Sequence, residues 1–200
     1  MRTAWEIVSE NPNNILVGVS GNLVFIKVQG KGGFQISQPL RQFSLEMIGR
    51  GYREFVVDLA ECSCMDSTFL GVLAGMGLRL QAADNSTGAS GKVHLANVNA
   101  RCREVLSSLG IDKLFTIDLC DLRVAGAANT SEPGAEMQSL QATPAASASA
   151  TDKAQQAEVM LEAHRTLMEI APQNVPKFKD CVRFLAEDLE KIRATRKAGA

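Results

Sequence analysis

The first half of the chain alternates between two kinds of apolar pattern, and turn residues separate one from the next. Short β-branched runs predict strands at 15–19, 23–28, 54–59, 92–95 and 114–117. Apolar residues at three- and four-residue spacing predict helices at 36–48, from 67 to about 80, and at 100–109. The turn Ser20-Gly21-Asn22 joins the first two strands into an expected β-hairpin. This order of elements predicts an α/β fold, a mixed β-sheet with packed helices and right-handed parallel connections.

The charge balance gives no indication of a polyanionic partner. Twenty-one basic and 22 acidic residues leave a formal net charge of −1, so we expect no nucleic-acid binding. The apolar runs are far shorter than the ~20 residues of a membrane helix, and the N-terminus lacks a signal-peptide hydrophobic region. We therefore expect a cytoplasmic protein without membrane insertion. Five cysteines and two histidines predict reduced thiols, with no metal and no cofactor.

Composition divides the chain into three segments. Residues 1–123 hold the α/β pattern, and residues 124–150 are rich in Ala, Ser, Thr, Gly, Glu and Pro, which predicts a flexible linker. Residues 151–200 predict a C-terminal helical pair, whose two helices are separated by Pro172 and Pro176. Because two helices alone have a thin core, we expect this pair to dock on the α/β domain or to associate with another chain. A solvated amphipathic tail is the alternative.

Asp66 and Ser67 stand where a strand and a short loop give way to a helix. The carboxylate of Asp66 can accept hydrogen bonds from the first-turn amides, and a hydroxyl at Ser67 or Thr68 can do the same. Helix capping alone would account for these residues. A small hydroxyl at a helix N-terminus can also accept a phosphoryl group, whose charge the helix dipole tolerates. Beside Asp66, that charge would repel a protein docked on this surface.

The run Met65-Asp66-Ser67-Thr68-Phe69-Leu70-Gly71-Val72-Leu73 resembles the signature of the STAS domain of bacterial anti-sigma-factor antagonists. Downstream, Leu95-Ala96-Asn97-Val98 and Leu109-Gly110-Ile111 are similar to later elements of that family, so that the resemblance covers about 15–121. It implies a non-catalytic regulator that binds an anti-sigma factor which is also its serine kinase. Phosphorylation would abolish this binding, and a phosphatase would restore it.

The resemblance implies that Ser67 is the phosphoacceptor, with Thr68 as a fallback. It implies a partner-binding surface made of Ser63, Cys64, Met65, Asp66, Ser67, Thr68 and Phe69. Two positions depart from the family pattern. Antagonists commonly read Asp-Ser-Ser/Thr-Gly-Leu-Gly, and Phe69 stands here in place of the first glycine. They also carry Gly-x-Leu-Asp after the second strand, whereas this chain has Gly30-Lys31-Gly32-Gly33 and no carboxylate.

These departures favour an alternative, a phosphorylation-independent STAS adaptor subunit of a transporter or signalling assembly. In either interpretation the C-terminal helices could provide a second interface or a self-association surface. We do not expect an enzyme, because neither His94 nor His164 has sequence neighbours that would form a catalytic triad. The spacing of Cys62 and Cys64 does not match a zinc site, and we expect Cys64 to face the core.

Overall fold

The computed structural model describes residues 13–87, 91–118, 138–140 and 150–198. The strands are β1 (Asn14–Ser20), β2 (Leu23–Gly32), β3 (Glu54–Asp58), β4 (Cys62–Met65), β5 (Lys92–Ala96), β6 (Thr116–Asp118) and β7 (Gln138–Leu140). The helices are α1 (Phe34–Gly49), α2 (Ser67–Thr87), α3 (Ala100–Ser108), α4 (Ala150–Ile170) and α5 (Val175–Ala198), with short 3-10 turns at Asp112–Leu114 and Pro172–Asn174.

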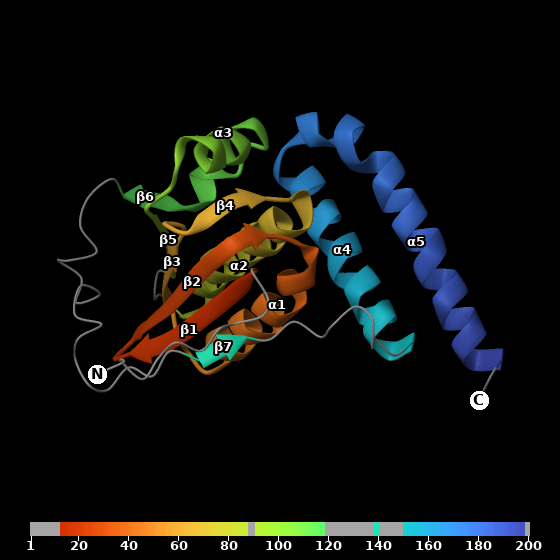
Figure 1. Ribbon diagram of the computed structural model, residues 1–200, viewed down its shortest axis with the longest axis horizontal. Coiled ribbons are helices and arrows are strands. Elements are labelled where there is room, and N and C mark those ends of the chain that lie inside the picture. The colour runs from red at the N-terminus through yellow and green to blue at the C-terminus, as the bar shows by residue number, and fades with distance from the viewer. Residues whose placement is uncertain (1–12, 88–90, 119–137, 141–149, 199–200) are drawn as a thin grey trace, which may run out of the picture.

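The described strands form one mixed sheet in the order β6-β5-β3-β2-β1-β7, and β4 pairs with β2 beside this path (Figure 1). Strands β1 and β2 form the expected antiparallel hairpin, with Gly21 at a positive φ of 56° in its turn. The pairs β2–β3, β3–β5 and β5–β6 are parallel. The predicted α/β fold with a mixed sheet and packed helices is therefore confirmed.

Strand β2 shows how the core is built. Val24, Ile26 and Val28 are buried, whereas the residues between them are half-buried, because successive side chains of a strand point to opposite faces. The buried face packs against α1 and α2, where Leu40 and Leu73 are both 0% exposed. Helices α1 and α2 consequently cover one face of the sheet and place their N-termini at one edge.

Two expected loops are strands in the structure. The segment Gly30-Lys31-Gly32-Gly33, which follows the expected strand 23–28, is not a loop. Strand β2 continues to Gly32, and Gly33 is the N-cap of α1. Residues Ser63–Met65, also expected to be a loop, belong to β4 (Cys62–Met65), which pairs with β2 beyond the point where β3 ends. Within β4, Cys62 faces the core at 2% exposure, whereas Cys64, which was expected to face the core, is half-buried.

Two other segments differ from the structure expected for them. Residues 114–117 were predicted as a strand, but Leu114 closes a 3-10 turn and the strand β6 begins at Thr116. Residues 138–140 lie inside the expected linker and form β7, which pairs antiparallel with β1. There, the Ser139 hydroxyl donates to Asn14 Oδ1 at 2.8 Å. The last residue of the expected linker, Ala150, begins α4, and residues 124–137 and 141–149 lie outside the described residues.

The C-terminal helices dock on the α/β domain, with α4 between that domain and α5 (Figure 1). One face of α4 joins the main core through Val159, Ala163 and Leu167. The opposite face packs on α5 in a small second cluster that includes Leu161 and Leu189. We call α4, the 3-10 turn and α5 together the C-terminal hairpin (150–198).

Candidate functional site

Asp66 joins the N-termini of two helices. Its Oδ1 accepts a hydrogen bond from the Phe69 amide of α2 at 3.0 Å, which confirms the expected cap. Its Oδ2 accepts a second hydrogen bond from the Phe34 amide, the first of α1, at 2.9 Å. The parallel strands β2 and β4 end side by side, and the Asp66 amide donates to the Gly32 carbonyl at 2.9 Å. One carboxylate therefore accepts hydrogen bonds from free amides of both helices, and it fixes the junction between β4 and α2 at which Ser67 lies.

The two departures from the antagonist pattern meet in the structure. The ring of Phe69 is 0% exposed, and a β-carbon built on Gly32 would lie 2.9 Å from its Cδ1 atom. The large ring of Phe69 thus occupies space that Gly32 leaves open. The family pattern has the reverse arrangement, a glycine at the position of Phe69 and a leucine at the position of Gly32. A β-carbon on Gly33 would lie 3.2 Å from Asp66 Oδ2. Gly33 stands where the family pattern has a carboxylate, and this position is therefore directly beside the carboxylate of Asp66.

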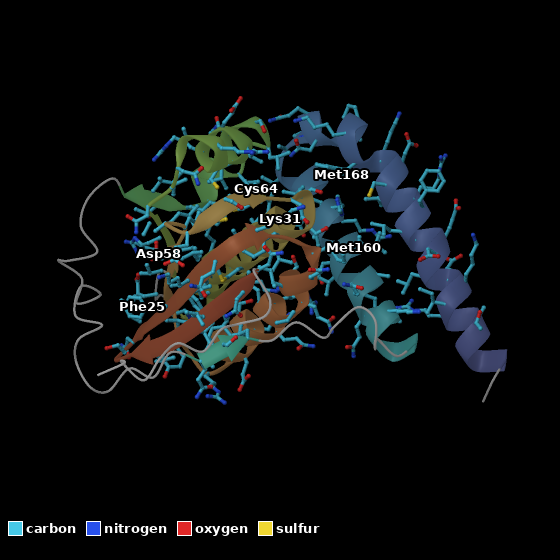
Figure 2. The ribbon with its side chains drawn as sticks, in the orientation of Figure 1. Phe25, Lys31, Asp58, Cys64, Met160 and Met168 are labelled. Atoms are coloured by element: carbon cyan, nitrogen blue, oxygen red, sulfur yellow. The ribbon has the colours of Figure 1, made fainter. Side chains whose placement is uncertain are left out.

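The predicted partner-binding residues differ in exposure. Ser63 is exposed, and Cys64, Asp66 and Ser67 are half-buried. Met65 and Phe69 are buried in the main core, and Thr68 is also buried, at 3% exposure. The accessible part of this surface is therefore formed by Ser63, Cys64, Asp66 and Ser67. The exposed Lys31, whose backbone pairs with Cys64, lies beside them (Figure 2).

The hydroxyl of Ser67 contacts the C-terminal hairpin. Its Oγ lies 2.9 Å from Nε2 of His164 on α4, and Nδ1 of that ring lies 2.7 Å from the Met160 carbonyl oxygen. A carbonyl only accepts, so we assign the proton to Nδ1; in the neutral ring Nε2 then accepts the hydroxyl proton of Ser67. His164 is 4% exposed, and the ring of Phe178 packs edge-on against it at 5.2 Å.

This arrangement corrects one expectation from the sequence. A hydroxyl, an imidazole base and a carbonyl that orients the base do come together, although Ser67 and His164 are 97 residues apart. Two described features do not match a hydrolytic site. The Phe69 amide is already bound to Asp66, and neither Ser67 nor His164 lines the groove of about 560 Å³ between α2, α4 and α5. The geometry fits a contact between two parts of the chain better than a catalytic pair.

Three consecutive residues of α4 contact three different features of the α/β domain. Glu162 pairs with Arg41 of α1 at 2.6 Å and with Arg79 of α2 at 2.7 Å. Ala163 lies over Gly71, where an added β-carbon would be 2.6 Å from the Ala163 carbonyl carbon. His164 binds Ser67. We call these residues the 162–164 segment.

Burial makes the thiols of Cys62 and Cys102 poor nucleophiles. Burial raises the pKa of the Cys62 thiol to about 11, and it also raises the pKa of Cys102. Cys62, Cys64, Cys102 and Cys181 are all free thiols. Among the described residues, no group of three or more His, Cys, Asp and Glu side chains could hold a metal ion.

The order of the strands and helices, with Asp66 and Ser67 at the start of α2, is similar to that of the STAS domains of anti-sigma-factor antagonists. No protein-family model matches the chain. A curated protein of Pseudomonas aeruginosa (strain UCBPP-PA14), the STAS-domain containing protein PA14_20770, is 29% identical over 102 residues. That match covers 51% of this chain and 94% of the relative.

Two solved structures are also similar. A putative anti-sigma factor antagonist of Thermotoga maritima is 17% identical, with a TM-score of 0.45, and the match covers 50% of this chain and 82% of that one. The unphosphorylated anti-sigma factor antagonist SpoIIAA, a cell fate determinant of Bacillus, is 20% identical, with a TM-score of 0.46. That match covers 56% of this chain and 93% of SpoIIAA. In the described part of the chain, no helix has the length and apolar character needed to cross a membrane.

Proposed function

We propose that the protein is a non-catalytic regulator of the STAS type, switched by phosphorylation of Ser67 in the manner of an anti-sigma-factor antagonist. Its partner is an anti-sigma factor that is also a serine kinase, and a phosphatase reverses the modification. This class of partner places the protein in the cytoplasm. One observation carries the proposal: the hydroxyl of Ser67, at the first position of α2 beside the capping Asp66, faces a separate part of the chain rather than the domain core.

The chemistry of the site supports a charge-operated switch. A phosphoryl group on Ser67 adds about −1.5 to −2 charges at pH 7, and the N-terminus of α2 stabilises such a charge through its dipole. The modified residue no longer has a hydroxyl proton to donate. A protein surface that packs against Ser63, Cys64 and Ser67 would then meet added bulk and negative charge beside Asp66.

Kinase assays with defined variants test the proposal. After incubation with the cognate kinase and ATP, mass spectrometry should find phosphate on Ser67 in the wild type and in Ser63→Ala, a control on the same surface. The variant Ser67→Ala should not be modified at 67 and should keep partner binding, whereas Ser67→Asp should lose it. Absence of phosphate from both Ser67 and Thr68 would contradict the proposal.

A second candidate is the phosphorylation-independent adaptor subunit of a transporter or signalling assembly. The observation that favours it is at Gly33, where the family pattern has a carboxylate and this chain has none. An adaptor would be captured with transporter or scaffold proteins rather than with a kinase. In that function Ser67→Asp and the uncharged Ser67→Asn, which has nearly the same size, would affect capture equally.

A further inference from the structure

We propose that the C-terminal hairpin is a built-in competitor for the partner-binding surface at the N-terminus of α2. In the docked state, the 162–164 segment holds the hydroxyl of Ser67, which belongs to this surface. It also covers Gly71 and pairs with Arg41 and Arg79, which lie beside the surface. A kinase or a protein partner gains access to Ser67 when α4 is displaced. The identity of the competing protein rests on the proposed function, whereas the docking and its control of access to position 67 do not.

The surface beneath α4 is shaped to receive a helix. Gly71 has no side chain, and the three atoms nearest to an added β-carbon all belong to the Ala163 backbone, at 2.3–2.7 Å. Such close approach of two helix backbones requires a small residue on each side of the contact. Gly75, one turn further along α2, has nothing within 4 Å of an added β-carbon. The absence of a side chain at 71 therefore allows α4 to approach α2 this closely.

Polar groups on both sides of Gly71 complete the surface. Arg41 and Arg79 reach from two different helices to the single carboxylate of Glu162. On the other side, Ser67 donates its proton to His164, whose tautomer is fixed by a carbonyl of its own helix. The surface thus recognises a helix with a carboxylate, a small residue and a hydrogen-bond acceptor in succession. A protein partner that binds the same surface through a helix is expected to carry the same three features.

The contacts allow displacement. The side chains of Arg41, Arg79 and Glu162 are 32–41% exposed, so their ion pairs lie in a solvated environment where salt screens them. The hydrogen bond from Ser67 depends on a hydroxyl proton that phosphorylation removes. A phosphoryl group on Ser67 would also have to fit between Oγ and the buried His164 ring, which lie 2.9 Å apart, so the docked geometry and phosphorylation oppose each other.

Two glycine variants of the full chain test the docking. Gly71→Ala and Gly75→Ala gain the same helix propensity on the same helix, but only the first places a methyl group against Ala163. Hydrogen–deuterium exchange followed by mass spectrometry should show exchange in α4 at least ten-fold faster in Gly71→Ala, with the sheet unchanged. Gly75→Ala should exchange like the wild type. Equal exchange in the two variants would overturn the inference.

A second pair of variants avoids any change inside α2. Glu162→Arg faces Arg41 and Arg79 with a like charge, whereas Glu158→Arg disrupts only the pairing of α4 with Arg193 of α5. We expect α4 to be released from the α/β domain in the first variant and to remain docked in the second. If α4 exchanges at the same rate in both, the inference fails, even if Gly71→Ala proves unable to fold.

Access to position 67 is measured without a kinase. In a Ser67→Cys background, a maleimide reagent should modify residue 67 at least ten-fold faster with Gly71→Ala than with Gly75→Ala, as judged from the peptide that contains it. Equal rates would overturn the proposed control of access. Faster labelling together with no phosphorylation of Ser67 by any kinase would support the competitor role of the hairpin and contradict the proposed function separately.

Discussion

Ala163 of α4 lies directly over Gly71 of α2, and a β-carbon at position 71 would be 2.6 Å from the Ala163 carbonyl carbon. In the antagonist pattern a glycine also stands at this position of the signature. In this chain, that glycine receives a helix from the C-terminal hairpin. A residue that the resemblance associates with the phosphorylation motif is thus also the seat of an intramolecular contact.

Replacing Asp66 tests whether one carboxylate stabilises two helices. Asp66→Ala removes the acceptors for the amides of Phe69 and Phe34, and each lost cap costs about 1 kcal/mol. Asp66→Asn keeps one acceptor oxygen, so we expect it to lose roughly half as much free energy of unfolding. Urea denaturation measures both values. If the alanine variant were no less stable than the asparagine variant, Asp66 would not bridge the helices.

Exchanging the sizes of residues 69 and 32 tests their packing. Phe69→Ala should lower the free energy of unfolding by about 3–5 kcal/mol, because it leaves a cavity above Gly32. Gly32→Leu alone should also destabilise the domain through its contact with the ring. The double variant Phe69→Gly with Gly32→Leu, which has the residues of the family pattern, should be more stable than the sum of its own single changes, Phe69→Gly and Gly32→Leu, predicts. A double-mutant cycle with no coupling energy would contradict this packing.

Restoring the family carboxylate at position 33 should make stability depend on pH. In Gly33→Asp the new carboxylate lies beside Asp66, and repulsion between them raises the pKa of the introduced group in the folded state. Stability is therefore reduced at pH 7 and recovers as pH falls and this group is protonated. The difference in Tm from Gly33→Asn, the uncharged control, should shrink between pH 7 and pH 4. A constant difference would show that repulsion is not the cause.

Alkylation of the cysteines should follow burial and pKa. Burial raises the pKa of Cys62 to about 11, so its reactive thiolate is scarce at pH 8. We expect iodoacetamide to modify the half-buried Cys64 and Cys181 first and to leave Cys62 and Cys102 largely unmodified in the folded protein. Peptide mass spectrometry gives the order, and the same reaction in urea is the control. Modification of Cys62 as fast as Cys64 in the folded state would contradict this order.

Local patterns were sufficient to predict most of the α/β domain. The hairpin, the helices and the parallel strands have periodicity and turn residues of their own, and Asp66 caps α2 because a carboxylate suits a helix start. Strands β4 and β7 were missed because such short segments have no detectable period. They are strands because β2 and β1 offer free edges to pair with.

The contact between Ser67 and His164 could not be predicted from local sequence patterns, for a different reason. An amphipathic pattern shows which face of α4 is buried, but not the surface on which that face packs. One signal was present in the sequence: small residues at 154, 157 and 163 indicate that α4 approaches other helices closely. Together with a glycine at 71, they could have suggested where the helix docks.

Strand β7 also shortens the path by which the hairpin is tethered. Because Gln138–Leu140 are fixed to β1, only residues 141–149 separate an anchored point of the sheet from the start of α4. A short tether keeps the effective concentration of a displaced segment high, so rebinding in cis outcompetes exchange with a second molecule. Strand β7 therefore favours the return of a displaced α4 to its own α/β domain.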